Sequence, residues 1–188
     1  MKDRTIRVTP PLSEEEVRAM RAGERVSITG VIYTARDAAH KRLVEASQRG
    51  EPLPVDLAGQ IIYYVGPCPA RPGQAIGSAG PTTSGRMDTY APTLIELGLR
   101  AMLGKGLRSP AVVEAMKRHG SVYLAATGGA GALLARQIMR ADVIAYPDLG
   151  PEAIHRLEVR DFPAIVAIDT LGNDMYAEGK RRYARPQK

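Results

Sequence analysis

An arginine, an aspartate and a histidine lie close together where the sequence changes from strand-like to helix-like. The stretch from Tyr33 to His40 reads YTARDAAH, with Arg36 and Asp37 at the junction. Backbone N–H groups at the start of a helix attract anions, so these groups and the Arg36 guanidinium could face one ligand. His40 follows Asp37 by three residues, where the carboxylate could hold the imidazole in one tautomer. The alternative is structural, with Asp37 as the helix cap and His40 partly buried.

Hydroxyl groups and a second arginine lie on a glycine-flanked turn. The segment reads Thr82-Thr83-Ser84-Gly85-Arg86. Glycine lets the backbone come close to a ligand, and the arginine fork can donate two parallel hydrogen bonds to a carboxylate. The same hydroxyls could instead cap a helix that begins near Met87. Lys105 lies between two glycines that leave room for an anion, although it could equally be a solvated turn lysine.

Other motifs give weaker signals. Residues 80–87 have the spacing of a phosphate-binding loop, but arginine and methionine replace the lysine and hydroxyl that such a loop uses. Residues 129–134 carry a leucine where a dinucleotide turn needs a small residue. Cys68 has no neighbouring lysine or histidine to lower its pKa. One cysteine and three histidines exclude a self-contained iron–sulfur or zinc site, which needs several such ligands.

The length and composition favour one folded domain. The chain has 188 residues, of which 44% are hydrophobic, and a net charge of +6. We expect residues 1–188 to form a single domain with a solvated basic tail over approximately residues 178–188. No apolar run approaches the roughly 18 residues of a membrane span, and no signal-like segment begins the chain, so we expect a cytoplasmic protein. The charge fits either a nucleic-acid face or clustered cations for small anions.

Strand-like and helix-like segments alternate in the second half of the chain. This alternation predicts a largely parallel α/β core, and the β-rich ends predict additional antiparallel strands. Gly30, inside a predicted strand, indicates a bulge or a close backbone approach. A loop over residues 66–88 is long enough to be functional. Strands are expected over residues 4–9, 25–34, 61–65, 99–103, 121–126, 143–146, 154–159 and 164–170. Helices are expected over residues 13–23, 37–47, 93–98, 111–118 and 131–140.

Several of these motifs occur in the same order in class I fumarases. They are ARDAAHKR (residues 35–42), IIYYVGP (61–67), AGPTTSGRMD (79–88), LGKG (103–106) and DLGPEAI (148–154). Across nearly its whole length, the chain resembles the β subunit of the two-subunit, iron–sulfur-dependent fumarate hydratase. It is also similar to the related tartrate dehydratase β subunit. The resemblance implies a swivelling β/β/α-type domain, in agreement with the mixed α/β fold expected above.

The resemblance implies a reaction, a cofactor and a partner. The reaction is the reversible addition of water to fumarate, giving S-malate. The cofactor is a [4Fe–4S] cluster held by three cysteines of an α subunit, so we expect no metal ligand in this chain. We expect an α2β2 heterotetramer whose β subunit supplies cations for the dicarboxylate, and neither nucleic-acid nor membrane binding.

The same resemblance assigns roles to individual residues. Four residues are implied to bind the substrate: Arg36 and Arg86 through its carboxylates, together with Thr83 and Asp37. Thr82, near the carbon that exchanges a proton, and Lys105, beside the substrate, are expected to be catalytic. His40 is expected either to be catalytic or to support Arg36. Preorganised cations would stabilise the charge that develops when a proton is removed next to a carboxylate.

Two alternatives remain open from the sequence. A tartrate dehydratase subunit would keep the architecture and change the substrate by one hydroxyl. A non-enzymatic basic binding module would instead recognise nucleic acid or an acidic protein, with binding that weakens steeply as salt is added.

Overall fold

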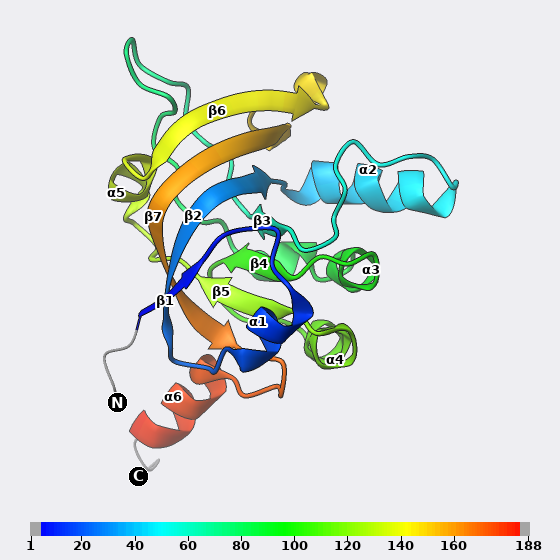
Figure 1. The fold of residues 1–188 in the computed structure, drawn as a ribbon, viewed down its shortest axis with the longest axis vertical. Helices are drawn as coiled ribbons and strands as arrows, with labels where there is room; N and C mark the ends of the chain where they lie inside the picture. Colours follow the sequence, from blue (N-terminus) through cyan, green and yellow to red (C-terminus); the bar gives the residue numbers. More distant parts are fainter. Residues whose placement is uncertain (1–4, 185–188) are drawn as a thin grey trace.

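Residues 5–184, which the computed structural model describes, contain seven strands in one mixed sheet (Figure 1). The sheet order is β1-β2-β3-β4-β5-β7-β6. The strands are β1 (Thr5–Val8), β2 (Arg25–Thr34), β3 (Ile61–Tyr63), β4 (Ala101–Gly104), β5 (Val122–Ala125), β6 (Ile138–Ala145) and β7 (Ile154–Ile168). The α-helices are α1 (Glu14–Ala19), α2 (Asp37–Gln48), α3 (Ala91–Glu96), α4 (Pro110–His119), α5 (Gly131–Ala135) and α6 (Met175–Tyr183). Two short 3-10 helices are η1 (Ser84–Met87) and η2 (Pro147–Glu152). The predicted mixed α/β fold with flanking helices is confirmed.

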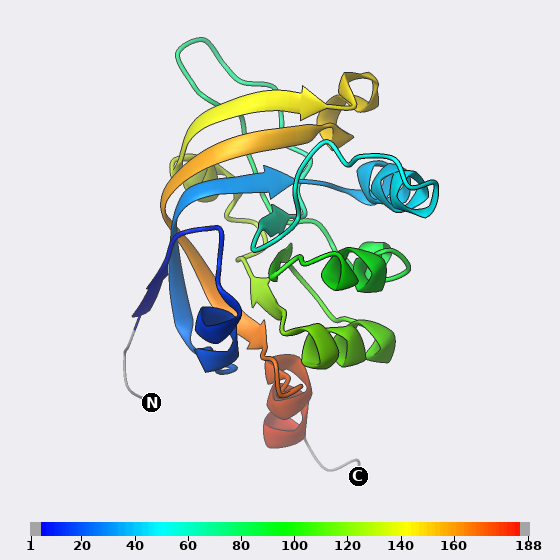
Figure 2. The same ribbon diagram turned by 45° about the vertical axis from the view of Figure 1, so that its right-hand side comes forward.

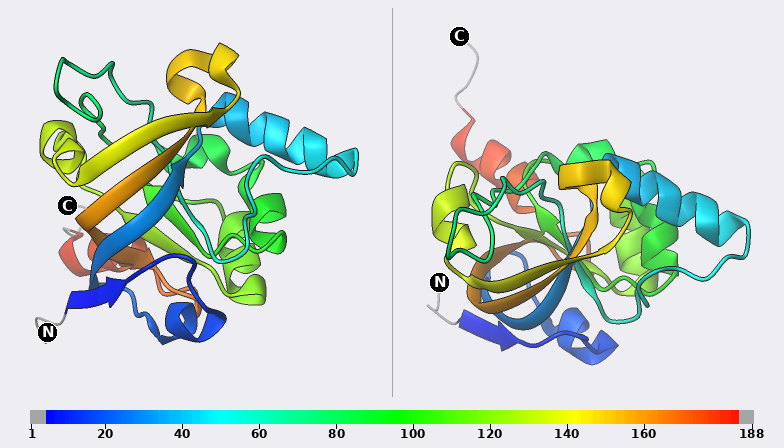
Figure 3. Two further views of the ribbon diagram at one scale, coloured as in Figure 1. Left: turned by 45° about the horizontal axis from the view of Figure 1, so that its top comes forward. Right: turned by 90° about the horizontal axis from the view of Figure 1, so that it is seen from above.

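The strand pairings close into a ring. From β1 to β5, neighbouring strands pair in parallel. The long β7 runs antiparallel to both β2 and β5, which joins the two ends of the series β2-β3-β4-β5. β6 adds to β7 on the other side. Figure 3 shows the strong curvature that this closure produces.

Two hydrophobic cores lie on the two faces of the sheet. In the central strands, alternate residues belong to different cores, because successive side chains of a strand point to opposite faces. The core inside the curved sheet receives Ile61, Tyr63, Ala101, Leu103, Val122 and Leu124. The outer core receives Ile62, Met102 and Tyr123 together with apolar residues of α2, α3 and α4. These three helices lie along one side of the sheet in Figure 2.

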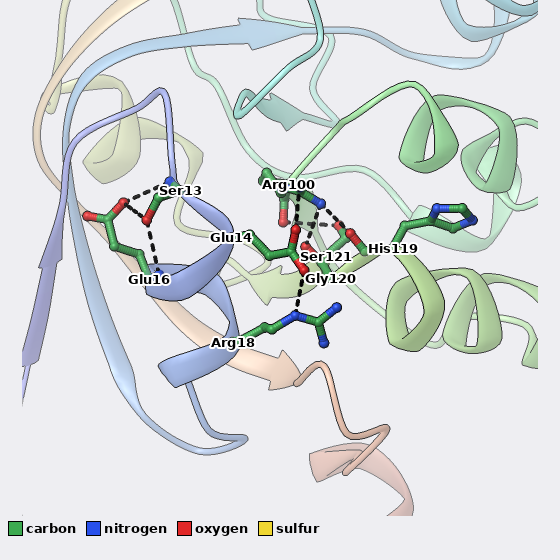
Figure 4. Close-up of polar contacts among 8 residues, drawn as sticks. All are labelled: Ser13, Glu14, Glu16, Arg18, Arg100, His119, Gly120 and Ser121. Carbon is green, nitrogen blue, oxygen red and sulfur yellow. Dashed lines mark hydrogen bonds and ion pairs between the residues drawn. The ribbon is translucent and has the colours of Figure 1, made fainter.

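The predicted start of α1 is confirmed in detail (Figure 4). The Glu16 backbone N–H donates to Ser13 Oγ at 3.2 Å, and the Ser13 N–H donates to Glu16 Oε2 at 2.8 Å. This reciprocal pair is a capping box. Arg100 Nη2 lies 3.2 Å from Glu14 Oε2, so α1 is also tied to the segment before β4. Gly30 has a φ of 127° beside a register shift between β2 and β7, as the expected bulge requires.

Two expectations about the second half of the chain are wrong. The helix expected over residues 131–140 ends at Ala135, because the residues that follow pair with β7 as strand β6. The two strands expected over residues 154–170 form one strand, which passes through Asp161 at a φ of 50°. The basic tail begins as helix α6, whose start is capped by the Asp174 carboxylate. Its exposed basic side chains agree with a solvated tail; residues 185–188, like Arg4 of the first predicted strand, lie outside the described residues.

The expected long loop is present between β3 and η1, and it projects at the top of Figure 1. Its tip, residues 68–75, is exposed. No helix in residues 5–184 combines the length and the apolar character needed to cross a membrane.

Candidate functional site

The candidate residues gather where the parallel strands end. Arg36 follows β2, Gly66 follows β3, and Lys105 follows β4 directly. Ligands of open α/β sheets commonly bind outside the carboxyl ends of parallel strands. The threonine turn joins this edge, because the Thr82 N–H donates to the Tyr64 carbonyl at 2.8 Å. These elements form one continuous edge of the molecule.

Arg36 is held in place by its own backbone and by a glycine opposite it. The residue has extended φ and ψ angles of −119° and −164° and is the N-cap of α2. Its side chain is 20% exposed, and Nη2 lies 3.2 Å from Glu152 Oε1 and 3.7 Å from Asp37 Oδ2. A Cβ atom on Gly66 would lie 2.6 Å from Arg36 Nη1. The guanidinium therefore occupies space that only glycine leaves free.

Asp37 links the two candidate arginines. Arg86 Nε donates to Asp37 Oδ1 at 2.9 Å, which connects η1 to the start of α2. The second oxygen, Oδ2, is inaccessible and accepts no hydrogen bond within the described residues. The expectation that Asp37 caps α2 is wrong by one residue, since Arg36 is the cap and Asp37 is the first helical residue. A carboxylate so close to both guanidiniums is placed to orient them.

His40 lies behind Arg36 and is fully buried. Its Nδ1 lies 3.0 Å from the Arg36 carbonyl oxygen, an acceptor, so Nδ1 carries the proton in this hydrogen bond. The expected tautomer-fixing partner was the Asp37 carboxylate, and the structure supplies this carbonyl instead. Burial lowers the pKa of His40 to about 4, and the charge of Arg108 acts in the same direction. The neutral imidazole thus contacts the backbone of Arg36 from inside the protein, and both roles expected of His40 stay predictions.

Lys105 and the threonines form the other end of the edge. Thr83 pairs with Lys105 through the backbone, and the Ser84 N–H donates to the Lys105 carbonyl at 2.9 Å. The Lys105 side chain is exposed and extends over Gly128, where an added Cβ would meet Nζ at 3.8 Å. Thr83 precedes η1 without capping it through its side chain, so the capping alternative for this hydroxyl is wrong. Thr82 is half-buried and Thr83 is exposed.

A buried ion pair anchors the two loops that carry these residues. Arg108, whose side chain is 0% exposed, donates through Nε to Asp88 Oδ1 at 2.7 Å. The Ser109 N–H donates to the other Asp88 oxygen at 2.6 Å. Ser84 also meets the Tyr123 hydroxyl at 2.8 Å. Neither Arg108 nor Glu152 was singled out by the sequence, because their partners are distant along the chain and no local spacing reveals them.

The structure brings some candidates together and leaves others apart. Asp37 contacts both Arg36 and Arg86, and Thr82, Thr83 and Lys105 share a backbone network. No ion pair or hydrogen bond joins Lys105 to either arginine within residues 5–184. A cavity of about 560 Å³ lies elsewhere, between the projecting loop and α5, and includes none of the seven candidate residues. In the described part of the chain, no group of His, Cys, Asp or Glu side chains could hold a metal ion.

Comparison with known proteins decides the family. Residues 1–179 match the family described as Fumarase C-terminus. This chain belongs to that family. It is 44% identical over 172 residues to the aerobic class I fumarate hydratase of Salmonella typhimurium, covering 89% of this chain and 30% of that protein. It is 44% identical over 158 residues to fumarate hydratase 2 of Leishmania major, covering 83% of this chain and 28% of that protein.

A third relative has nearly the same length. The putative L(+)-tartrate dehydratase subunit beta of Methanocaldococcus jannaschii is 40% identical over 177 residues, which cover 91% of each chain. The chain thus spans about 30% of the fumarate hydratases and nearly all of a protein named as a subunit. The resemblance noted from the sequence motifs is confirmed at the level of the family.

Proposed function

We propose that this chain is the β subunit of a two-subunit hydro-lyase that converts fumarate and S-malate into each other. The observation that carries the proposal is the Arg36–Asp37–Arg86 group at the carboxyl ends of the parallel strands. Two guanidiniums from separate elements, oriented by one carboxylate between them, suit a ligand with two carboxylates. The membership of the Fumarase C-terminus family supports the same reaction.

In this proposal the arginines bind the two substrate carboxylates. Lys105, whose side chain is exposed at the end of β4, adds a third positive charge. Removing a proton next to a carboxylate concentrates negative charge there, and fixed cations stabilise that charge more than the ground state. Thr82 is the proposed proton-transfer group and Thr83 a substrate contact, since both lie on the turn between the arginines and Lys105. His40 supports Arg36 from behind.

The proposed partner is a cluster-bearing α subunit. The described residues hold no ligand set for an iron–sulfur cluster, and Cys68 lies exposed on the projecting loop. We propose that the partner holds a [4Fe–4S] cluster, which would supply Lewis-acid chemistry at the substrate hydroxyl. We also propose that the exposed edge around Arg86 and Lys105 faces this partner in an α2β2 assembly. The name of the tartrate dehydratase relative, a beta subunit, supports a partner subunit.

The test is reconstitution with a cluster-bearing α subunit under anaerobic conditions, followed by assays with fumarate, malate and both tartrates. We expect no hydratase activity from this chain alone and activity from the complex. Arg86→Ala should abolish turnover while the complex still assembles. Arg49→Ala is the matched control, because Arg49 forms a similar exposed ion pair with Glu51 away from this edge. Normal turnover by the Arg86 variant would contradict the proposal.

A second candidate substrate is tartrate. The relative that matches this chain end to end is named as a tartrate dehydratase subunit. Turnover of L(+)-tartrate in the same assays, without turnover of malate, would favour this reading and keep the roles of the arginines.

A further inference from the structure

The carboxylate of Glu152 contacts two parts of the candidate site at once. Its Oε1 lies 3.2 Å from Arg36 Nη2, and its Oε2 accepts a hydrogen bond of 3.0 Å from the Ala38 N–H. The Glu152 side chain is 24% exposed and the Arg36 side chain 20%. One half-buried carboxylate therefore joins the guanidinium to the first turn of α2.

This contact replaces a cap that the local sequence does not supply. Helices begin with N–H groups that lack partners within the helix, and a side chain just before the helix often accepts from them. Arg36 occupies that place in α2 and makes no such bond. Glu152, 114 residues further along the chain, accepts from Ala38 instead. Its negative charge also suits the positive end of the helix dipole.

A second ion pair docks the Glu152 segment on α2. Glu152 is the last residue of η2, which connects β6 to β7. At its other end, Arg42 of α2 binds Asp148 through both carboxylate oxygens, with Nη1 and Oδ1 2.9 Å apart. Gly150 between them has φ and ψ angles of 56° and −121°, which turn the chain between the two contacts. Glu152 is thus presented to Arg36 from a fixed direction.

We propose that Glu152 is a positioning residue that sets the direction of the Arg36 guanidinium for the substrate carboxylate. The inference rests on the proposed function. Arg36 Nη2 lies between Glu152 at 3.2 Å and Asp37 Oδ2 at 3.7 Å, and Asp37 Oδ2 accepts no hydrogen bond within residues 5–184. Without the charge of Glu152, Asp37 draws the guanidinium into a closed ion pair. That pair competes with the substrate for the same N–H groups.

The first arm of the test uses Glu152→Gln, with Glu51→Gln as the matched control, in the reconstituted complex. The glutamine oxygen can still accept from Ala38, so the variant removes the charge and keeps the cap. We expect Glu152→Gln to raise the KM for malate about tenfold or more, as for the loss of one charge-assisted hydrogen bond. Its kcat should change much less. Glu51→Gln removes one charge from the exposed pair with Arg49, away from this edge, and should leave KM and kcat within about twofold.

The second arm needs no activity. The Arg36 Nε–H resonance of the isolated 15N-labelled chain is identified by its loss in Arg36→Lys. It should shift in Glu152→Gln and stay in place in Glu51→Gln. An active Glu152→Gln complex with unchanged KM overturns the proposal, and so does an unshifted Arg36 resonance. An inactive wild-type complex contradicts the proposed function, while the resonance still decides whether Glu152 orients Arg36.

Discussion

Arg86 Nε and Asp37 Oδ1 lie 2.9 Å apart, and this hydrogen bond joins η1 to the first residue of α2. It connects two segments that are 49 residues apart in sequence. Because Asp37 also lies beside Arg36, the two proposed carboxylate-binding groups are not independent. Each arginine takes part of its orientation from the same aspartate.

Asp37→Asn is therefore expected to weaken both arginines. The amide has no charge to hold Arg86, and its NH2 group repels one guanidinium wherever it points. We expect the KM for malate in the reconstituted complex to rise by about tenfold to a hundredfold. Glu51→Gln, which alters the exposed pair with Arg49, is the control and should leave KM unchanged. An unaltered KM in Asp37→Asn would show that the arginines do not depend on this bridge.

Gly66→Ala is expected to displace Arg36. The new Cβ would lie 2.6 Å from Arg36 Nη1 and 3.2 Å from its Cδ, so the side chain must move. Substrate affinity should fall strongly while the melting temperature changes little, because the far end of a flexible side chain can give way. Gly179→Ala is the matched control: nothing lies within 4 Å of its new Cβ, and it sits in helix α6. That variant should gain up to about 1 kcal/mol in stability and keep wild-type activity.

His40 predicts a specific dependence of stability on pH. Its pKa is about 4 in the folded chain, against about 6.5 when unfolded. As the pH falls from 6.5 towards 4, the unfolded chain takes up a proton that the folded chain does not. The free energy of unfolding should therefore fall across this window, by about 2–3 kcal/mol at pH 4.5. The amide of His40→Asn can still donate to the Arg36 carbonyl but does not titrate. In urea titrations, the free energy of unfolding of this variant should therefore lose the His40 contribution to its decrease between about pH 6.5 and 4.5. The same dependence of the free energy of unfolding on pH in the wild type and the variant would contradict this prediction.

Asp169 is expected to be a stabilising residue remote from the site. Its buried carboxylate accepts from the N–H groups of Ala22, Leu171 and Asn173 at 3.0–3.1 Å, and from Asn173 Nδ2 at 2.9 Å. Burial opposes ionisation, but these hydrogen bonds outweigh it and hold the pKa of Asp169 below its usual value. Its contribution is present above the unfolded pKa and is lost as the pH falls below about 4.

Asp169→Asn should lower the free energy of unfolding by about 1–3 kcal/mol at pH 7, because its NH2 group faces donors. Asp161→Asn is the control, since the exposed Asp161 carboxylate accepts a single hydrogen bond, from Ser27. Asparagine also tolerates the positive φ of that position. Thermal and urea unfolding at pH 7 measure the stability of both variants. If both lose the same free energy of unfolding, Asp169 does not stabilise the fold more than an exposed aspartate does.

The sequence predicted the fold where local patterns and tertiary contacts agree. Residues 25–34 are rich in β-branched side chains and pair with three strands, so the predicted bounds of β2 are those observed. Residues 136–140 have good helix formers, yet they pair with β7, because sheet pairing outweighs weak local preferences. Helix α6 was not predicted, although Asp174 is a typical cap, because the basic residues after it indicated only a solvated tail.

The sequence singled out candidate residues by type and spacing, but it indicated few of the contacts that the structure shows between them. Arg36 and Arg86 were candidates because arginine binds carboxylates and both lie where the chain was predicted to turn. Their shared contact with Asp37 could be seen only in the folded structure. The one-residue error at the start of α2 arose because a remote glutamate supplies the cap. Arg108 is buried against two tyrosine rings and Asp88, a setting that no sequence spacing near it indicates.

The antiparallel pairing of β7 with β2 and β5 has a consequence for synthesis on the ribosome. All seven candidate residues have been made once the chain has passed Lys105, but the strands that hold them stay an open sheet until Ile154–Ile168 emerges. Glu152 leaves the ribosome only just ahead of that strand. A nascent chain stopped before this point would expose two unpaired strand edges and a disoriented Arg36. The edge that carries the candidate site is thus among the last parts of the protein to be completed. Shortening the carboxyl-terminal end should disrupt this edge without removing any of the seven candidate residues.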